Sequence, residues 1–362
     1  MFGHLRRPHR SEPPALMLLR LQKGLPAEQI AAVLALAGEL GYRARFLDDH
    51  SEILSLEGQG RPEHRSKFED LCGVRSILDA REARERHERD GRSDTVVRVG
   101  EARFGGGFVS LVAGPCAVED RERSLEIARE VRSRGATLLR GGAWKPRTSP
   151  YSFQGLHDAG LEILAEDKAV TGIGIVTEVL DPRDVAKVVE VADMLQIGAR
   201  SMTNTPLLIE AGRSKKPVLL KRGFQATIRE FLLAAEFVLA QGNTQVVLCE
   251  RGIRGFDPTT RNLLDVGAVA HLKRATHLPV IVDPSHAAGR SDLVRPLARA
   301  GLAAGADGLI VEVHPDPSEV HSDGSQAVSP EMFGDIVKDA LALAALDGKR
   351  VVLAEELAPR AR

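Results

Sequence analysis

Short apolar segments alternate with amphipathic segments along the chain after residue 107. The segment 108–114, FVSLVAG, is typical of a strand covered by helices, whereas 122–135 has helical periodicity and ends at Gly135. Seven further pairs follow: ATLLRGG with GLEILAED, IGIVTEV with PRDVAKVVEVA, DMLQIGA with TPLLIEAGRS, PVLLKRG with TIREFLLAAEFVLAQ, QVVLCERG with LLDVGAVAHLKRAT, PVIVDPS with LVRPLARAGLAAG, and DGLIVEVHP with EMFGDIVKDALALAAL. Eight strand–helix pairs in a row favour an α/β fold of the (β/α)8, or TIM barrel, type.

An open Rossmann-type sheet is the alternative fold. Such a sheet would carry a G-x-G-x-x-G turn after its first strand, and the sequence has none at that place. GIGIV at 172–176 lacks the third glycine and precedes a strand. The closed barrel is therefore the favoured fold.

A different pattern precedes the barrel. Segments 15–22, 42–48, 52–58 and 74–80 read as strands, and 27–40 and 64–73 read as helices, which gives the βαββαβ order of a small ferredoxin-like α+β domain. The charged run REARERHERDGRSD predicts a solvated linker with a helical first half, and TVVRVGEARFGGG predicts a hairpin. We expect residues 1–90 to form the front domain with its linker, 91–350 the barrel, and 351–362 a tail.

Composition narrows the class of protein. The 362 residues suit a barrel of about 250 residues with an appendage. With a formal net charge of −1, the protein as a whole does not attract nucleic acid or an anionic membrane electrostatically. Three cysteines make no disulfide framework, the apolar runs are too short to span a bilayer, and SEPPA follows the basic start in place of an apolar signal segment. We therefore expect a cytoplasmic protein that binds neither nucleic acid nor membrane.

Unusual side chains stand where the expected strands run into their loops, which is where barrel enzymes carry their chemistry. These positions are Cys116, Arg140, Lys145, Glu178, Arg200, Lys221, Arg251, His286 and Glu312, with Arg147 nearby. Some of the cations could pair with acids such as Glu178 or Glu250. So many cations at one mouth would nevertheless repel each other without anionic ligands, and their groups match phosphate and carboxylate. The pattern predicts polyanionic small ligands, more than one of them.

A second set consists of Cys116, His286, Glu312 and Asp323. Each alone has an ordinary structural explanation: a buried thiol, a hydrogen-bonded imidazole, or a turn former before Gly324. Strands one, seven and eight become neighbours when the barrel closes. A thiolate, an imidazole and two carboxylates suit one divalent ion such as Mn²⁺, Fe²⁺, Co²⁺ or Zn²⁺. His314 and His321 remain competing ligands.

Several long motifs identify a family resemblance. They are GPCAVE at 114–119, LLRGGAWKPRTSPYSFQG at 138–155, LQIGARSM at 195–202, KKPVLLKRG at 215–223, CERGIRGFDPTTRN at 249–262, DPSHAAGR at 283–290 and HSDGSQAV at 321–328. With these the chain resembles the type I-beta 3-deoxy-D-arabino-heptulosonate 7-phosphate (DAHP) synthases over essentially the whole barrel. Gly255 and Asp257-Pro258 depart from the Thr and the Glu-Thr pair of many relatives, but this leaves Arg251 in place.

The resemblance implies an aldol-type condensation of phosphoenolpyruvate with erythrose 4-phosphate, the first step of aromatic amino-acid synthesis. It implies metal ligation by Cys116, His286, Glu312 and Asp323. It also implies phosphoenolpyruvate binding by Arg140, Lys145, Arg200, Lys221 and Arg251, and erythrose 4-phosphate binding by Pro146, Arg147 and Thr148. Lys145, Cys116 and His286 would then be the catalytic residues. The sequence leaves open whether the metal orients the aldehyde or the attacking water.

Two other activities stay open at this point. 3-Deoxy-D-manno-octulosonate 8-phosphate synthase uses arabinose 5-phosphate on the same barrel, but that family carries a K-A-N-R-S-S type segment where this chain has KPRTSP. An inactive barrel that binds an amino acid or acts as a scaffold is the non-enzymatic alternative. The front domain resembles modules that bind tyrosine or phenylalanine and cover the barrel mouth, and the alternative is a domain that serves only oligomerisation. Relatives suggest a homotetramer.

Overall fold

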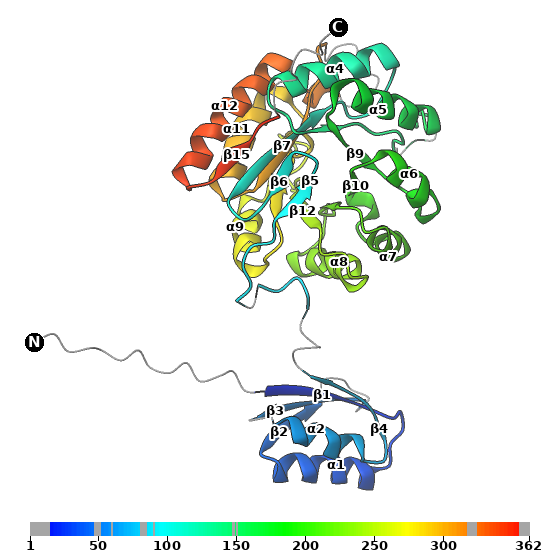
Figure 1. Ribbon diagram of the computed structural model, residues 1–362. Helices are drawn as coiled ribbons and strands as arrows, with labels where there is room; N and C mark the ends of the chain where they lie inside the picture. Colours follow the sequence, from blue (N-terminus) through cyan, green and yellow to red (C-terminus); the bar gives the residue numbers. More distant parts are fainter. Residues whose placement is uncertain are drawn as a thin grey trace, which may run out of the picture. The chain divides into compact units, whose positions relative to one another are not determined.

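The computed structural model describes residues 15–46, 52–58, 61–79, 85–89, 91–146, 149, 151–316 and 324–354 (Figure 1). The chain divides into two compact units after Glu85, close to the domain limit expected at residue 90.

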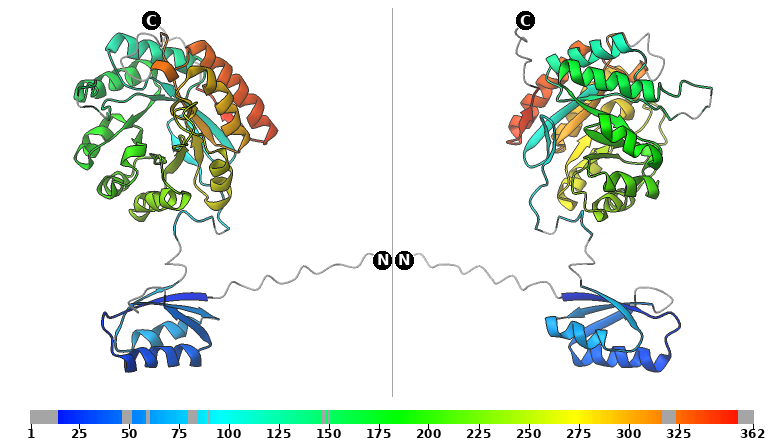
Figure 2. Two further views of the ribbon diagram at one scale, coloured as in Figure 1. Left: turned by 180° about the vertical axis from the view of Figure 1, so that it is seen from behind. Right: turned by 45° about the vertical axis from the view of Figure 1, so that its right-hand side comes forward.

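The first unit is a four-stranded antiparallel sheet with two helices on one face (Figure 2). Its elements are β1 (Ala15–Leu21), α1 (Ala27–Glu39), β2 (Tyr42–Phe46), β3 (Ile53–Gly58), α2 (Pro62–Glu69) and β4 (Val74–Asp79). The strand order β2-β3-β1-β4 is that of a ferredoxin-like sheet. Leu19 and Leu54 of the sheet pack with Val33 of α1 and Phe68 of α2, all fully buried. The small α+β domain expected from the sequence is confirmed.

The second unit is a closed parallel barrel. Its strands are β7 (Phe108–Gly114), β8 (Leu138–Arg140), β9 (Gly174–Glu178), β10 (Met194–Ile197), β11 (Val218–Lys221), β12 (Val246–Glu250), β13 (Val280–Val282) and β14 (Gly308–Glu312). Each pairs with the next, and β14 pairs back with β7 from Gly308 beside Ser110 to Glu312 beside Gly114. Because the sheet closes on itself, the (β/α)8 barrel is confirmed and the open Rossmann sheet is excluded. β15 (Arg350–Val352) adds to the start of β7, so the barrel sheet extends into the segment expected as a tail.

Helices surround the strands, as Figures 1 and 2 show. They are α4 (Arg121–Ser133), α5 (Asp158–Thr171), α6 (Val185–Val191), α7 (Thr205–Arg213), α8 (Ile228–Ala240), α9 (Val266–Ala275), α10 (Pro284–Ala288), α11 (Ser291–Ala303) and α12 (Pro330–Leu346). Short 3-10 turns lie at η1 (Pro182–Asp184), η2 (Ala199–Ser201) and η3 (Gly324–Gln326). Side chains cap several helices: Thr227 and Glu230 form a reciprocal capping box on α8, and Asp283 caps α10.

A hairpin of β5 (Val97–Val99) and β6 (Ala102–Phe104) closes the amino-terminal end of the barrel. Its apolar side chains join one buried cluster with inward-pointing barrel residues such as Val112 and Ile310. Phe104 is fully buried and lies beside Gly308, where an added Cβ atom would clash with the Ser110 carbonyl oxygen at 2.4 Å and lie 3.2 Å from the Phe104 ring. The opposite, carboxyl end of the strands is left for the functional site.

The latter part of the charged run 81–94 differs from the expected solvated linker, because it is docked on the barrel. Glu236 of α8 accepts hydrogen bonds from the backbone N–H groups of Arg86 (2.9 Å) and His87 (3.1 Å), and Thr276 Oγ1 donates to the His87 carbonyl oxygen at 2.5 Å. Arg89 donates to the carbonyl oxygens of Lys273 and Thr276 at the end of α9. Backbone groups of this segment and the side chain of Arg89 therefore find hydrogen-bond partners on the barrel. Residues 81–84 and 90 lie outside the described residues.

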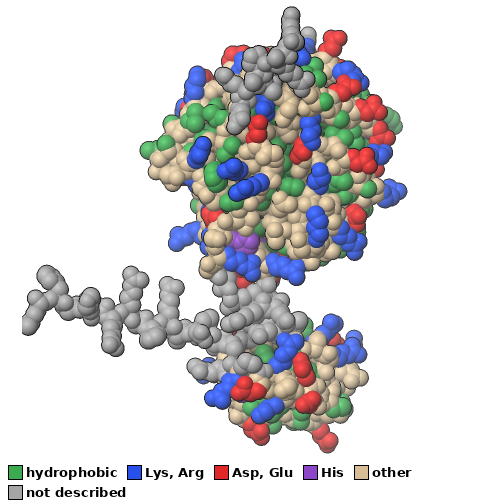
Figure 3. Space-filling model, in the orientation of Figure 1, with side chains coloured by type: hydrophobic (Ala, Val, Ile, Leu, Met, Phe, Trp, Pro, Cys, Tyr) green, Lys and Arg blue, Asp and Glu red, His purple; other side chains and the backbone are tan. Residues whose placement is uncertain are grey.

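Surface charge is mixed in sign. Basic and acidic side chains both occur on the face shown in Figure 3, in keeping with the net charge of −1. Among the residues that the structure describes, none of the helices has the length and apolar character needed to cross a membrane.

Candidate active site at the barrel mouth

A cavity of about 210 Å³ opens at the carboxyl end of the barrel strands. Eight of the nine residues expected at strand ends line it: Cys116, Arg140, Lys145, Glu178, Arg200, Lys221, Arg251 and His286. Pro146 lines it as well, and the ninth residue, Glu312, contacts His286 just behind the wall. The structure therefore brings together side chains that are up to 196 positions apart, from Cys116 to Glu312.

Two of the cations are deeply buried and are held by acids. Arg140 Nε donates to the Pro115 carbonyl oxygen at 3.1 Å, and its Nη2 lies 3.2 Å from Glu312 Oε1. Lys221 Nζ donates to Asp283 Oδ2 at 2.5 Å. Burial opposes the charged form of Arg140, but the neighbouring charges of Glu312 and Cys116 raise its pKa overall. Arg140 therefore stays charged inside the cavity wall.

Phe224, in the loop after β11, organises two further cations. The guanidinium of Arg251 lies 4.7 Å from the centre of its ring and that of Arg200 lies 5.5 Å from it, so both make cation–π contacts. Burial lowers the pKa of Arg251, while the charge of Asp283 opposes this and that of Arg261 adds to it. Phe224 thus holds two guanidinium groups in the cavity lining, where both are available to an anionic ligand.

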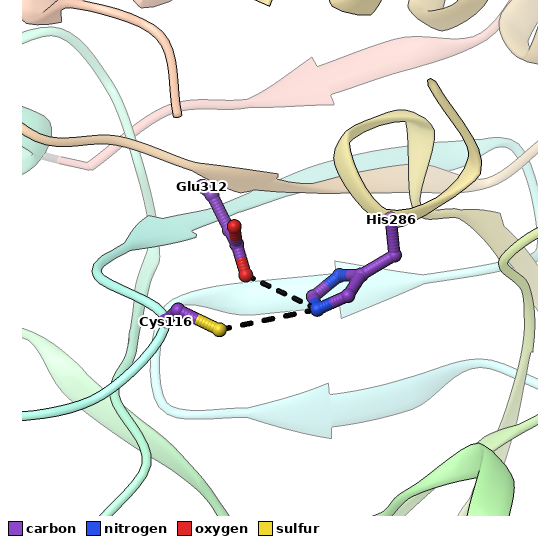
Figure 4. Close-up of side chains that lie close together, drawn as sticks. All are labelled: Cys116, His286 and Glu312. Atoms are coloured by element: carbon purple, nitrogen blue, oxygen red, sulfur yellow. Dashed lines mark hydrogen bonds and ion pairs between the residues drawn. The ribbon is translucent and has the colours of Figure 1, made fainter. Parts of the chain in front are cut away.

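Cys116, His286 and Glu312 form a compact cluster with the character of a metal site (Figure 4). One potential ligand atom from each lies within 4.8 Å of the others. His286 Nε2 is 3.1 Å from Glu312 Oε1 and 3.9 Å from Cys116 Sγ. Lys145 Nζ contacts the same sulfur, which places an ammonium group beside the cluster.

Asp283 orients His286 for this cluster. Its Oδ1 accepts from the His286 backbone N–H at 2.9 Å, and its Oδ2 lies 2.7 Å from His286 Nδ1. A carboxylate at Nδ1 favours a proton there, which leaves Nε2 as the electron-pair donor that faces Cys116 and Glu312. Burial lowers the pKa of His286 to about 4, so the imidazole is neutral at physiological pH, as a metal ligand must be.

Glu312 has the properties expected of a carboxylate that binds a metal ion. Its Oε2 accepts from Gln326 Nε2 at 2.6 Å. Its buried Oε1 makes no hydrogen bond within the described part of the chain, but it lies 3.2 Å from Arg140 Nη2 and 3.1 Å from His286 Nε2. Burial alone would raise the pKa of Glu312, but the charges of His286 and Arg140 lower it overall. A charged oxygen aimed at a thiol and an imidazole fits a divalent ion, so the residues present suit the metal expected from the sequence.

Glu178 is a half-buried acid that lines the cavity. Burial raises its pKa, although Lys221 and Lys145 pull in the other direction. Gln196 Nε2 donates to its Oε2 at 3.2 Å. A Cβ atom at Gly198 would lie 1.9 Å from Glu178 Oε1, so the glycine leaves the space that this carboxyl group fills.

Three of the residues expected from the sequence lie outside the described residues: Arg147, Thr148 and Asp323. Four residues of the site were missed: Asp283, Gln326, Phe224 and Arg261. Asp283 could have been found, because an Asp-Pro pair after a buried strand marks a helix cap beside His286. Gln326 and Phe224 carry no such signal, since their contacts depend on loops that meet only in the folded barrel.

The fold and the site together define a (β/α)8-barrel enzyme with a cationic mouth and a candidate metal centre. The model of the DAHP synthetase I family matches residues 93–344. A phospho-2-dehydro-3-deoxyheptonate aldolase of Thermotoga maritima is 45% identical over 341 residues, which cover 92% of this chain and 100% of that protein. A crystal structure of a T. maritima enzyme of that name, also called DAHP synthase, superposes with a TM-score of 0.74 at 44% identity and covers 93% of this chain and 99% of its own.

A second group of relatives is more distant. A 2-dehydro-3-deoxyphosphooctonate aldolase of Syntrophotalea carbinolica is 33% identical over 270 residues, which cover 69% of this chain and 96% of that protein. The chain belongs to the DAHP synthetase I family, and its activity is that of a DAHP synthase.

Proposed function

We propose that the barrel mouth condenses phosphoenolpyruvate with erythrose 4-phosphate to give DAHP and inorganic phosphate. The observation that carries this proposal is the contact between a cationic cavity and the cluster of Cys116, His286 and Glu312. Phosphoenolpyruvate carries a carboxylate and a phosphate, which are the groups that lysine and arginine bind best.

Phosphoenolpyruvate would be held by the cations on the cavity wall: Arg140, Lys145, Arg200, Lys221 and Arg251. Arg200 and Arg251 flank Phe224 and offer planar forks, while Lys221 is fixed by Asp283. Erythrose 4-phosphate would enter beside Pro146, with Arg147 and Thr148 toward its phosphate or hydroxyl groups. Pro146 supports this placement because it lines the same cavity.

Cys116, His286 and Glu312, joined by Asp323, would hold one divalent ion: Mn²⁺, Fe²⁺, Co²⁺ or Zn²⁺. Glu312 Oε1 and His286 Nε2 lie 3.1 Å apart, so both atoms could bind the same ion. When bound, such an ion supplies Lewis-acid chemistry for the condensation.

The chain's own residues then have separate tasks. C3 of phosphoenolpyruvate attacks the aldehyde carbon, and negative charge grows on the aldehyde oxygen. Lys145 would give that oxygen a proton, and the contact of its Nζ with Cys116 Sγ supports this role. Water adds to C2, and phosphate leaves with cleavage of its C–O bond. Arg200 and Arg251 would hold the phosphate group throughout and stabilise the departing anion.

A phosphate-release assay distinguishes this activity from its alternatives. The protein is supplied with Mn²⁺, phosphoenolpyruvate and either erythrose 4-phosphate or arabinose 5-phosphate. We expect release only with erythrose 4-phosphate. Equal or faster release with arabinose 5-phosphate would favour the octulosonate reaction of the 33% identical relatives. Absence of release with both sugars would favour an inactive barrel.

For the front unit we propose regulation by tyrosine or phenylalanine in a homotetramer. Its compact sheet and its buried core of Leu19, Leu54 and Phe68 support an independently folded domain. Deleting residues 1–84 keeps the docked segment that begins at Arg86. Inhibition by an aromatic amino acid should disappear in that variant. A full-length enzyme that ignores both amino acids would leave the domain with a role in oligomerisation alone.

A further inference from the structure

Gln326 connects a cation of the mouth to the candidate metal cluster. Arg261 Nη1 donates to Gln326 Oε1 at 2.9 Å, and Gln326 Nε2 donates to Glu312 Oε2 at 2.6 Å. Gln326 is fully buried at the end of η3, whereas Arg261 is exposed and lines the cavity. The side chains thus form a chain of hydrogen bonds from the cavity wall to Glu312.

The segment that carries Arg261 also supports His286. The backbone N–H groups of Arg261 and Asn262 donate to the carbonyl oxygens of Ala288 and Ala287, and Asn262 Nδ2 donates to the His286 carbonyl oxygen at 2.9 Å. The Arg261 side chain packs so closely on Gly289 that a Cβ atom there would lie 2.5 Å from it. Two adjacent residues of the β12–α9 loop, Arg261 and Asn262, therefore contact groups that hold Glu312 and His286 in place.

We propose that Arg261 and Gln326 form a positioning relay that holds Glu312 in its ligating orientation. An amide side chain can present either its oxygen or its nitrogen to a carboxylate, and only the nitrogen attracts it. Because Arg261 can only donate, its hydrogen bond fixes the oxygen of Gln326 on its own side. The nitrogen must then face Glu312, which is restrained through Oε2 while Oε1 faces Cys116 and His286.

The relay rests on the metal site proposed above, and it goes further by assigning a role to two residues outside the ligand set. Partners of this kind set the orientation of metal ligands, and their replacement typically weakens metal binding about 10- to 100-fold. Through Gln326 the relay also gives the exposed Arg261 an effect on the buried Glu312.

The test is a titration of the metal-free full-length protein with Co²⁺, followed through the absorption of the Cys116 thiolate–cobalt bond. Gln326→Leu should weaken Co²⁺ binding about 10- to 100-fold. Arg261→Ala should weaken it too, and Arg261→Lys, which keeps a donor, should lie closer to the unchanged protein. Because the two residues act in series, the double variant should bind no more weakly than Gln326→Leu alone.

Arg254→Ala is the matched control, since this exposed arginine stands in the same loop and should leave the affinity unchanged. The melting temperature of each metal-free variant reports on folding. If the unchanged protein bound no Co²⁺, the metal site itself would be wrong. If it bound Co²⁺ and Arg261→Ala bound equally well, the relay alone would be refuted, even if Gln326→Leu failed to fold.

Discussion

Asp283 Oδ2 accepts from two sides at once: it lies 2.7 Å from His286 Nδ1 and 2.5 Å from Lys221 Nζ. The carboxyl group is fully buried, and burial opposes its charge. In the acid range, where His286 is protonated, the charges of His286 and Lys221 nevertheless hold the pKa of Asp283 well below its ordinary value. One carboxylate thus connects the candidate metal cluster to the cationic wall of the cavity.

Replacing Asp283 should therefore impair both halves of the site. Asp283→Asn keeps the shape but removes the charge that orients His286 and neutralises Lys221. We expect metal affinity and kcat each to fall about 10- to 100-fold. Metal titration and steady-state phosphate release measure the two quantities.

The control for this variant is Asp292→Asn on α11, where an exposed carboxylate pairs with Arg290 at 2.8 Å. Exposed pairs contribute little, so metal affinity and kcat should stay unchanged. An Asp283→Asn enzyme with unchanged metal affinity would show that Asp283 does not orient His286.

Gly198 makes room for Glu178, and filling that room should damage the cavity. In Gly198→Ala the new Cβ would lie 1.9 Å from Glu178 Oε1, so the carboxyl group must move. We expect a loss of about 1–3 kcal/mol in the free energy of unfolding, typical of overpacking, and a higher KM for phosphoenolpyruvate.

Gly223→Ala is the matched change in the next loop, because its added Cβ would meet its nearest neighbour at an ordinary 3.4 Å. Thermal unfolding and initial-rate kinetics of the two variants should differ clearly. Equal KM values in Gly198→Ala and the unchanged enzyme would mean that Glu178 has no influence on substrate binding.

The docked linker should loosen in mild acid because of His277. This residue lies 2.7 Å from both Thr95 Oγ1 and the Arg86 carbonyl oxygen. Burial lowers its pKa, the hydrogen bond to Arg86 opposes this, and the charges of Arg92 and Arg89 lower it further. A histidine whose folded pKa lies below the unfolded value of 6.5 stabilises fully above pH 6.5, and that stability is lost as pH falls through the folded pKa.

Thermal unfolding between pH 7.5 and 5 tests this account. His277→Gln should lose part of the decrease in melting temperature that the unchanged protein shows toward acid pH. His271→Gln, on the exposed side of α9, should retain it. Identical pH profiles for the His277→Gln variant and the unchanged protein would rule out His277 as the titrating group.

Much of the fold can be predicted from the sequence because apolar residues repeat differently in strands and in helices. These two patterns can be distinguished along most of the chain. The sequence also locates the strand ends, and this predicts that Arg140, Lys221 and His286 lie at the barrel mouth. The features that the sequence did not predict depend on contacts between segments that are far apart in the chain. His87 stands in a highly charged run, yet it is buried because Glu236 and Thr276 supply hydrogen bonds to it.

The residues of the site also divide into those that the sequence identifies and those that only the folded structure reveals. Cys116 and Glu312 were recognisable as chemically unusual strand-end residues, whereas the role of Gln326 depends on the orientation of an amide between Arg261 and Glu312. Sequence periodicity carries no information about such an orientation. Arg147, Thr148 and Asp323 stay predictions, since they lie outside the described residues.

The central claim is that a metal held at Cys116, His286 and Glu312 supports the condensation. It is tested most directly by phosphate release from phosphoenolpyruvate and erythrose 4-phosphate after chelator treatment, with and without added Mn²⁺, in the unchanged protein and in Cys116→Ala. We predict that chelation abolishes the activity, that Mn²⁺ restores it in the unchanged protein, and that Cys116→Ala stays inactive with Mn²⁺. Full activity of chelator-treated Cys116→Ala would contradict the account.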